Sequence, residues 1–127
     1  GRSILFEFGL RHAFSNDLVL RAIYDNVGAP WAVCITPGPH QYLYSSNSNP
    51  DSNNSEIAAV TGEIYKMELD GTILGKFGKP GKPLGEFGTV HQIDCRNENE
   101  LTVVEITNWR GQRLILHPPE AGAGAKK

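Results

Sequence analysis

Residues 68–94 read ELDGTILGKFGKPGKPLGEFGTVHQID and hold a turn signal, a strand-like run and a loop rich in Gly and Pro. Asp70-Gly71 separates the apolar runs 63–69 and 72–77. Asp-Gly suits the left-handed backbone of a tight hairpin turn. The pattern therefore predicts that these two runs pair as antiparallel strands.

Short runs of the same kind recur along the rest of the chain, between clusters of Gly, Pro, Asn and Asp, and long helical periodicity is absent. The sequence therefore predicts an all-β fold. Residues 50–61 are polar and loosely patterned, and they are predicted to be an insertion between neighbouring strands. The predicted strands are residues 3–8, 18–24, 31–35, 42–46, 63–69, 72–77, 90–95, 101–106 and 112–117.

Composition restricts the class of protein. The chain has 127 residues, 39% of them hydrophobic, which allows one modest domain with a core. Its 12 Lys and Arg against 14 Asp and Glu give a formal net charge of −2, so we expect neither nucleic acid nor a membrane surface as a partner. Residues 118–127 offer no large apolar side chain and are predicted to be a flexible tail.

The chain has two cysteines, Cys34 and Cys95. Two cysteines cannot build a disulfide framework, and neither lies in the Cys-x-x-Cys spacing of a metal or redox motif. Free cysteine is among the most frequently buried residue types. We therefore expect both to be small side chains of the core.

An internal repeat is the most informative feature of the chain. Residues 30–35 align with 90–95, which lays Val33 on Ile93, and residues 41–46 and 62–67 align with 100–105 and 111–116. Residues 71–78 also resemble residues 1–9. The repeat therefore predicts four-stranded units, blade-like over about residues 30–78 and 90–117, with residues 3–8 as a closing strand.

Four-stranded units at this period indicate propeller blades, because one blade cannot cover both of its faces without neighbours. The stretch 68–94, in which a strand ending Phe77-Gly78 leads through a Gly-rich loop to a His-containing inner strand, resembles a blade junction of the NHL-repeat family. Residues 101–105 and 113–116 resemble that family's middle strands. The resemblance implies antiparallel four-stranded propeller blades, about two in residues 1–117.

The resemblance also implies an assembly. A closed propeller of this family usually has about six blades, so something must complete this one. We expect a homo-oligomer or a larger propeller to which the chain contributes, with residues 3–8 pairing beside residues 112–117 of another copy. Two blades per chain predict a trimer, whereas a dimer fits if residues 18–24 belong to a third, incomplete blade.

His91 is the sharpest site candidate, because inner strands face the central channel, where the related amidating-lyase propellers place metal-binding histidines. We expect His91 to face the channel and Ile93 the packing between blades, from the alternation of side chains along a strand. Trp31 takes the place of His91 in the first repeat, so a ring of identical ligands is not supported. Zinc catalysis needs about three protein ligands, while His40 is predicted in a turn and His12 in a loop.

Glu105 corresponds to the family's acidic residue after its second strand, and Asn108 to its common polar Asn. The predicted function is therefore an NHL-like scaffold for ligand or protein binding, with His91, Trp31, Glu105 and Asn108 as binding residues. The alternative is a metal-dependent lyase or hydrolase, amidating-lyase-like or gluconolactonase-like, that binds zinc or calcium through His91 at the channel. Asp94 is a further candidate ligand for a divalent cation.

The role of the aromatic side chains of Trp31, Trp109 and Tyr44 can be interpreted in two ways. They could line a ligand cavity, but aromatic residues dominate β cores, so we expect them to pack between blades.

Overall fold

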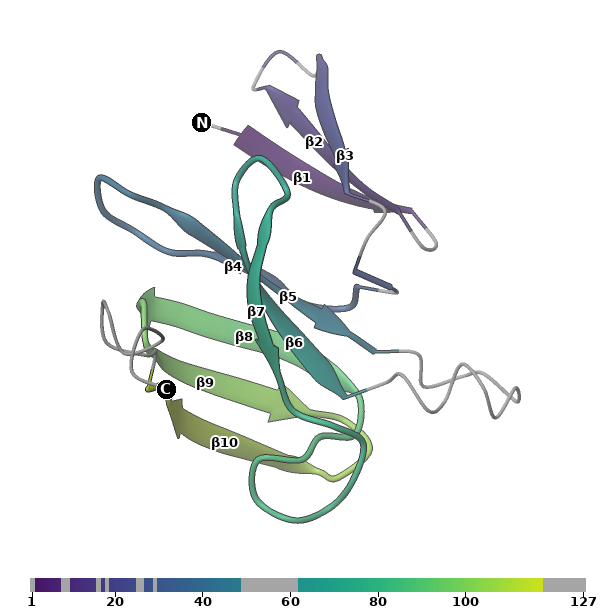
Figure 1. Ribbon diagram of the computed structural model, residues 1–127. Coiled ribbons are helices and arrows are strands. Elements are labelled where there is room, and N and C mark those ends of the chain that lie inside the picture. The colour runs from purple at the N-terminus through teal and green to yellow at the C-terminus, as the bar shows by residue number, and fades with distance from the viewer. Residues whose placement is uncertain are drawn as a thin grey trace, which may run out of the picture.

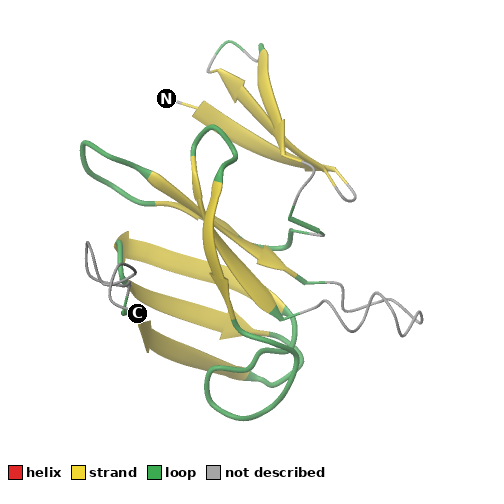
Figure 2. Ribbon diagram, viewed as in Figure 1, coloured by secondary structure: helices red, strands yellow, loops and turns green. Residues whose placement is uncertain are grey.

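The computed structural model describes residues 2–7, 10–15, 17, 19–24, 27–28, 30–48 and 62–117, with the backbone alone for the first two ranges. These residues form strands and no helix, which confirms the all-β prediction (Figure 2). No helix among them is long and apolar enough to cross a membrane. The predicted insertion and the predicted tail lie outside the described residues. The strands are β1 (Arg2–Glu7), β2 (Leu10–Ser15), β3 (Leu20–Tyr24), β4 (Val33–Ile35), β5 (Tyr42–Asn47), β6 (Glu63–Glu68), β7 (Ile73–Phe77), β8 (Val90–Asn97), β9 (Glu100–Glu105) and β10 (Arg110–Ile115).

The strands form three sheets (Figure 1): the first in the order β4-β5-β6-β7, the second in the order β10-β9-β8 and the third in the order β1-β2-β3. Every pairing is antiparallel. The described sheets do not close into a ring. The predicted hairpin between β6 and β7 is confirmed: Gly71 has φ 96°, and Asp70 Oδ1 accepts a 2.9 Å bond from the Thr72 amide.

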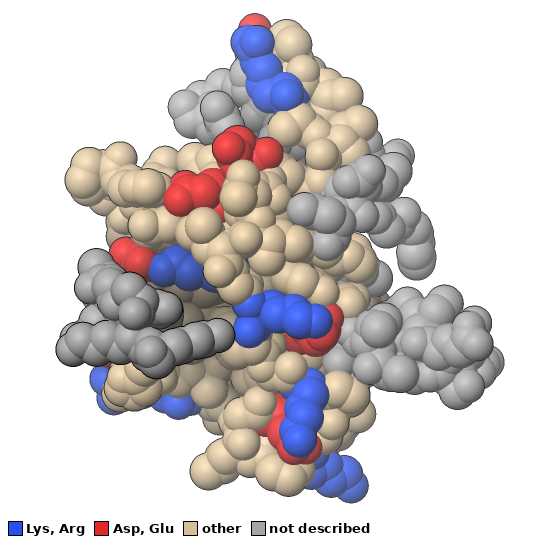
Figure 3. All heavy atoms as spheres, in the orientation of Figure 1, with Lys and Arg blue, Asp and Glu red and all other residues tan. Residues whose placement is uncertain are grey.

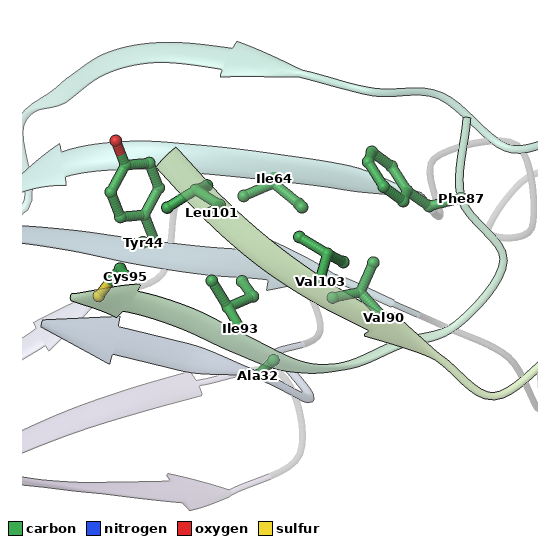
Figure 4. Packing of buried hydrophobic residues seen from close by; sticks show 9 residues of the cluster. All are labelled: Ala32, Tyr44, Ile64, Phe87, Val90, Ile93, Cys95, Leu101 and Val103. Atoms are coloured by element: carbon green, nitrogen blue, oxygen red, sulfur yellow. The ribbon is translucent and has the colours of Figure 1, made fainter. Parts of the chain in front are cut away.

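The four-stranded sheet is covered on both faces around β5. Leu43 and Tyr44 are consecutive and fully buried, and the alternation of side chains sends them to opposite faces. Leu43 packs with Tyr24 and Val27, next to β3. Tyr44 packs against the sheet of β8, β9 and β10, in a cluster with Ala32, Ile64, Phe87, Val90, Ile93, Cys95, Leu101 and Val103 (Figure 4). Burying each large side chain of this kind contributes about 1.5–3 kcal/mol.

A disulfide joins Cys34 of β4 to Cys95 of β8, with 6.0 Å between the Cα atoms. The prediction of two unpaired core cysteines is therefore wrong in its chemistry, although Cys95 is fully buried and both residues belong to the packed cluster. The bond closes a separation of 61 residues and depends on face-to-face packing of two sheets. Short-range spacing does not encode such a contact.

Strand registers support the internal repeat. Tyr42–Asn47 pairs with β6 along its whole length as Glu100–Glu105 pairs with β10, so β5 and β9 are equivalent strands. Val33 then pairs with Ser45 as Ile93 pairs with Val103, in agreement with the alignment of Val33 on Ile93. The same registers move the predicted alignment of the middle strand by one residue and that of the third strand by two. Arg110 is therefore the register equivalent of Glu63.

The N-terminal part differs from the prediction. Residues 10–15 form β2, which was not predicted, and His12 lies in this strand and not in a loop. The run Leu-Arg-His-Ala-Phe-Ser lacks the β-branched residues that favour strands, so the local sequence did not indicate a strand that pairs with β1. Residues 20–24, within the predicted run 18–24, form β3 of this third sheet.

Candidate functional site

The candidate site lies where β4 and β8, the first strands of their sheets, begin. The end of β5 reaches the same place: Ser46 Oγ accepts a 3.2 Å bond from the Trp31 amide, and Ser48 Oγ donates a 3.1 Å bond to the Val90 carbonyl. The loop 78–89, which follows β7, curls past the turn 106–109 at this end (Figure 1). We call this region the loop end.

Trp31 and His91 meet at the loop end. Their ring centroids are 5.9 Å apart and the rings are tilted by 59°. Trp31 keeps 42% of its surface exposed, and His91 is exposed as well. The structure thus brings together the two residues that the repeat places at equivalent positions. An exposed indole can stack on a planar group, and the neighbouring imidazole can exchange a hydrogen bond with it.

A β-bulge orients His91. Regular alternation along a strand puts residues 91 and 93 on the same face. Alternation alone therefore cannot send His91 and Ile93 to different sides, as was predicted. The register shifts between Val90 and Gln92, which leaves His91 as the extra residue of the bulge. Val90 and Ile93 therefore both point into the core, while His91 stays exposed. Ile93 is buried, as its predicted packing requires, but its packing between blades stays a prediction.

Glu105 and Asn108 lie behind this surface in a satisfied polar network. The Glu105 carboxylate is buried and accepts four bonds, from the Gly88 amide (2.7 Å), Asn108 Nδ2 (2.7 Å), Arg110 Nε (2.6 Å) and Gln112 Nε2 (2.8 Å). Burial acts to raise the pKa of Glu105, but the bonds led by Arg110 and Gln112 outweigh it and lower the pKa. The carboxylate is therefore held ionised as an anchor for its neighbours.

The same network fixes the loop 78–89. Asn108 Nδ2 donates to the Gly81 carbonyl at 2.9 Å, and Arg110 donates to the carbonyls of Lys82, Pro83 and Glu86. Gln112 also donates to Glu86, at 2.9 Å. Sequence reasoning missed Arg110 and Gln112. The sequence did contain a signal for them. The alternation of Leu101 and Val103 continues to Glu105, which puts a charged side chain on the core face of the strand. A buried charge needs polar partners, and these are the residues that were missed.

The network leaves Trp109 exposed. Trp109 is 91% exposed and has φ 52°, while Asn108 and Arg110 on either side are bonded to the loop. The expectation that Trp109 packs between blades is therefore wrong, whereas Tyr44 is fully buried as expected. Leu84, in the bonded loop, is also 87% exposed.

The remaining candidate ligands do not converge on His91. Among the described residues, no three His, Cys, Asp or Glu side chains are close enough to hold one metal ion. Asp94 is engaged by Arg96 at 2.9 Å, and that bond lowers the pKa of Asp94. His40 lies at the opposite end of β5, where it stacks on Tyr42 and contacts Glu68 at 2.8 Å.

No protein-family model matches the chain, and no curated protein is significantly similar to it. The fold and the loop end define it as an all-β protein of face-packed antiparallel sheets that carries an exposed aromatic and imidazole site.

Proposed function

We propose that this protein is an NHL-like propeller scaffold that binds a ligand or a protein at its loop end. The observation that carries the proposal is the exposed pair of Trp31 and His91, at the start of two adjacent inner strands. The buried Glu105 network ties the neighbouring loop 78–89 to the strand ends by hydrogen bonds. Exposed recognition groups on a rigid scaffold are typical of binding sites on β folds.

The packing of the sheets supports the propeller interpretation. β8 packs against both β4 and β5, so the first strand of one sheet lies beside the first strand of the next. The repeated strand order along the two sheets adds to this support. On the face of the described residues shown in Figure 3, acidic and basic groups lie close to one another rather than in a field of one sign. That distribution favours a ligand recognised by shape and hydrogen bonds.

A metal-dependent lyase or hydrolase is the second candidate, favoured by the bulge at His91. Bulges occur next to active sites, where they redirect a side chain. The described residues place no group of three His, Cys, Asp or Glu side chains where it could hold a metal ion. Under this alternative, further ligands for zinc or calcium come from other residues or from another copy of the chain.

The proposed propeller is completed by association. The chain contributes three sheets, of which β1-β2-β3 and β10-β9-β8 have three strands each. Two copies can cover the free edges of each other's incomplete sheets reciprocally, so the dimer replaces the trimer as the simplest assembly. The free edges of incomplete sheets would otherwise expose unpaired backbone groups.

The test combines metal analysis with a binding screen. We expect a thermal-shift library of small acids, sugars and short peptides to yield a ligand whose affinity falls at least tenfold in Trp31→Ala or His91→Ala. His40→Ala, at the opposite end, is the matched control and should bind as the wild type does. A ligand that binds both site variants normally would refute the site. Stoichiometric zinc or calcium that is lost in His91→Ala would favour the enzyme instead.

A further inference from the structure

We infer that a groove between β7 and the end of β10 receives strand β1 of a second copy, which pairs antiparallel with β10. This inference rests on the proposed association and names the segment that produces it. It concerns the open edge of β10, which reaches the loop end only at Arg110.

The groove is lined by both apolar and charged side chains. Leu74 and Phe77 of β7 line it together with Leu116, which comes just after β10. Lys66 of β6 also lines the groove and is paired with Glu98 from the turn between β8 and β9. Leu74 is half-exposed, so apolar surface here is open to an incoming strand. Covering such surface favours association.

The groove lies where a fourth strand of the second sheet belongs. The first sheet has β7 outside β6, whereas the order β10-β9-β8 has no strand outside β10 among the described residues. β10 is the equivalent of β6, because both pair along their whole length with equivalent strands. A strand added to β10 at that edge would face β7 across the groove. Open edges of this kind bind extended segments through backbone hydrogen bonds.

β1 is the segment that fits this place. Residues 1–9, GRSILFEFG, match residues 71–78, GTILGKFG, in their Gly boundaries and in the shared Ile-Leu and Phe-Gly. The matching run 73–77 is β7 itself, the outer strand of the first sheet. β1 pairs with β2 on one side only among the described residues, so its other edge is open for β10.

Charge complementarity supports the same pairing. In the first sheet, Lys76 of β7 forms a 2.8 Å ion pair with Glu63 of β6. The register equivalent of Glu63 is Arg110, and the sequence equivalent of Lys76 is Glu7. Both signs are reversed, so the pair is again attractive. Arg110 keeps its bonds to Glu105, and Glu7 would add a second acidic group beside it.

The test uses the full chain and two substitutions on one strand. Leu74 lines the groove, whereas Ile73 does not, so Leu74→Glu and Ile73→Glu form a matched pair. By analytical ultracentrifugation we expect a wild-type dimer, a dissociation constant at least tenfold higher for Leu74→Glu, and little change for Ile73→Glu. Equal effects of the two substitutions on a wild-type dimer would place the interface elsewhere.

A peptide keeps the inference testable if Leu74→Glu folds poorly. A synthetic peptide of residues 1–9 should compete with the second copy and raise the monomer fraction of the wild-type chain. The same peptide with Glu7→Lys should be several-fold weaker. A dimer that neither peptide affects would overturn the assignment of β1 while leaving the proposed association intact. A folded monomer at all concentrations would remove both, without touching the loop-end site.

Discussion

Glu105 and Arg110 form an ion pair, with 2.6 Å between Oε2 and Nε, on a carboxylate whose side chain has no solvent exposure. Arg110 also donates hydrogen bonds to the carbonyls of Pro83 and Glu86. The loop 78–89 is therefore tied through Arg110 to a buried charge. Removing either partner of a buried pair leaves an uncompensated charge behind.

We expect Glu105→Ala to lower the free energy of unfolding by about 3–5 kcal/mol, because it strands the Arg110 guanidinium. Urea unfolding followed by circular dichroism measures the loss. The control is Glu100→Ala, which removes an exposed pair with Arg113 and should cost less than about 1 kcal/mol. Similar losses in the two variants would mean that the Glu105 network does not support the fold.

The same carboxylate predicts a pH dependence. The pKa of Glu105 is lowered in the folded state, so its stabilisation is fully present above the unfolded pKa of about 4.3 and is lost as the pH falls through the lower folded pKa. The difference in unfolding free energy between wild type and Glu105→Ala should therefore shrink between pH 5 and pH 3, values chosen to bracket that pKa. A difference that stays constant over this range would contradict the assignment.

Reducing the disulfide between Cys34 and Cys95 should lower the free energy of unfolding by about 4 kcal/mol, on the loop-entropy relation for a separation of 61 residues. Urea unfolding with and without dithiothreitol measures this loss. Cys34→Ala/Cys95→Ala is the control, since its stability should not respond to the reductant. Alkylation of both cysteines in unreduced, unfolded protein would show that no bond exists.

Gly78 and Gly75 should respond differently to substitution by alanine. Gly78 has φ 83°, and a Cβ there would lie 2.6 Å from the Gly62 carbonyl oxygen. We expect Gly78→Ala to cost at least about 1–2 kcal/mol, the usual penalty of a left-handed backbone, plus the clash. Gly75 in β7 has no atom near its Cβ position, so Gly75→Ala should be neutral within about 0.5 kcal/mol. Thermal unfolding separates the two.

Local patterns predicted the strands around Asp70-Gly71 because turn chemistry and side-chain alternation both act within a few residues. The disulfide of Cys34 and the roles of Glu105 and Arg110 were not predicted, since each depends on segments that meet only after two sheets pack. His91 shows an intermediate case. Its strand was predicted, but its orientation depends on a bulge that the sequence does not mark.

The backbone conformation of Trp109 carries a stability cost. A bulky residue at φ 52° is strained, and a side chain that is 91% exposed has little packing to offset the strain. Asn tolerates the left-handed region, so Trp109→Asn should raise the free energy of unfolding by about 0.5–1 kcal/mol.

The control for this substitution is Trp31→Phe, because the φ of Trp31 is not positive. Trp31→Phe should therefore not raise the free energy of unfolding. Urea unfolding of both variants measures the difference. If Trp109 also contributes to the loop-end site, the stabilised Trp109→Asn variant should bind the ligand found by the screen more weakly than the wild type. A loss of stability in Trp109→Asn would show that the exposed indole makes contacts that outweigh its backbone strain.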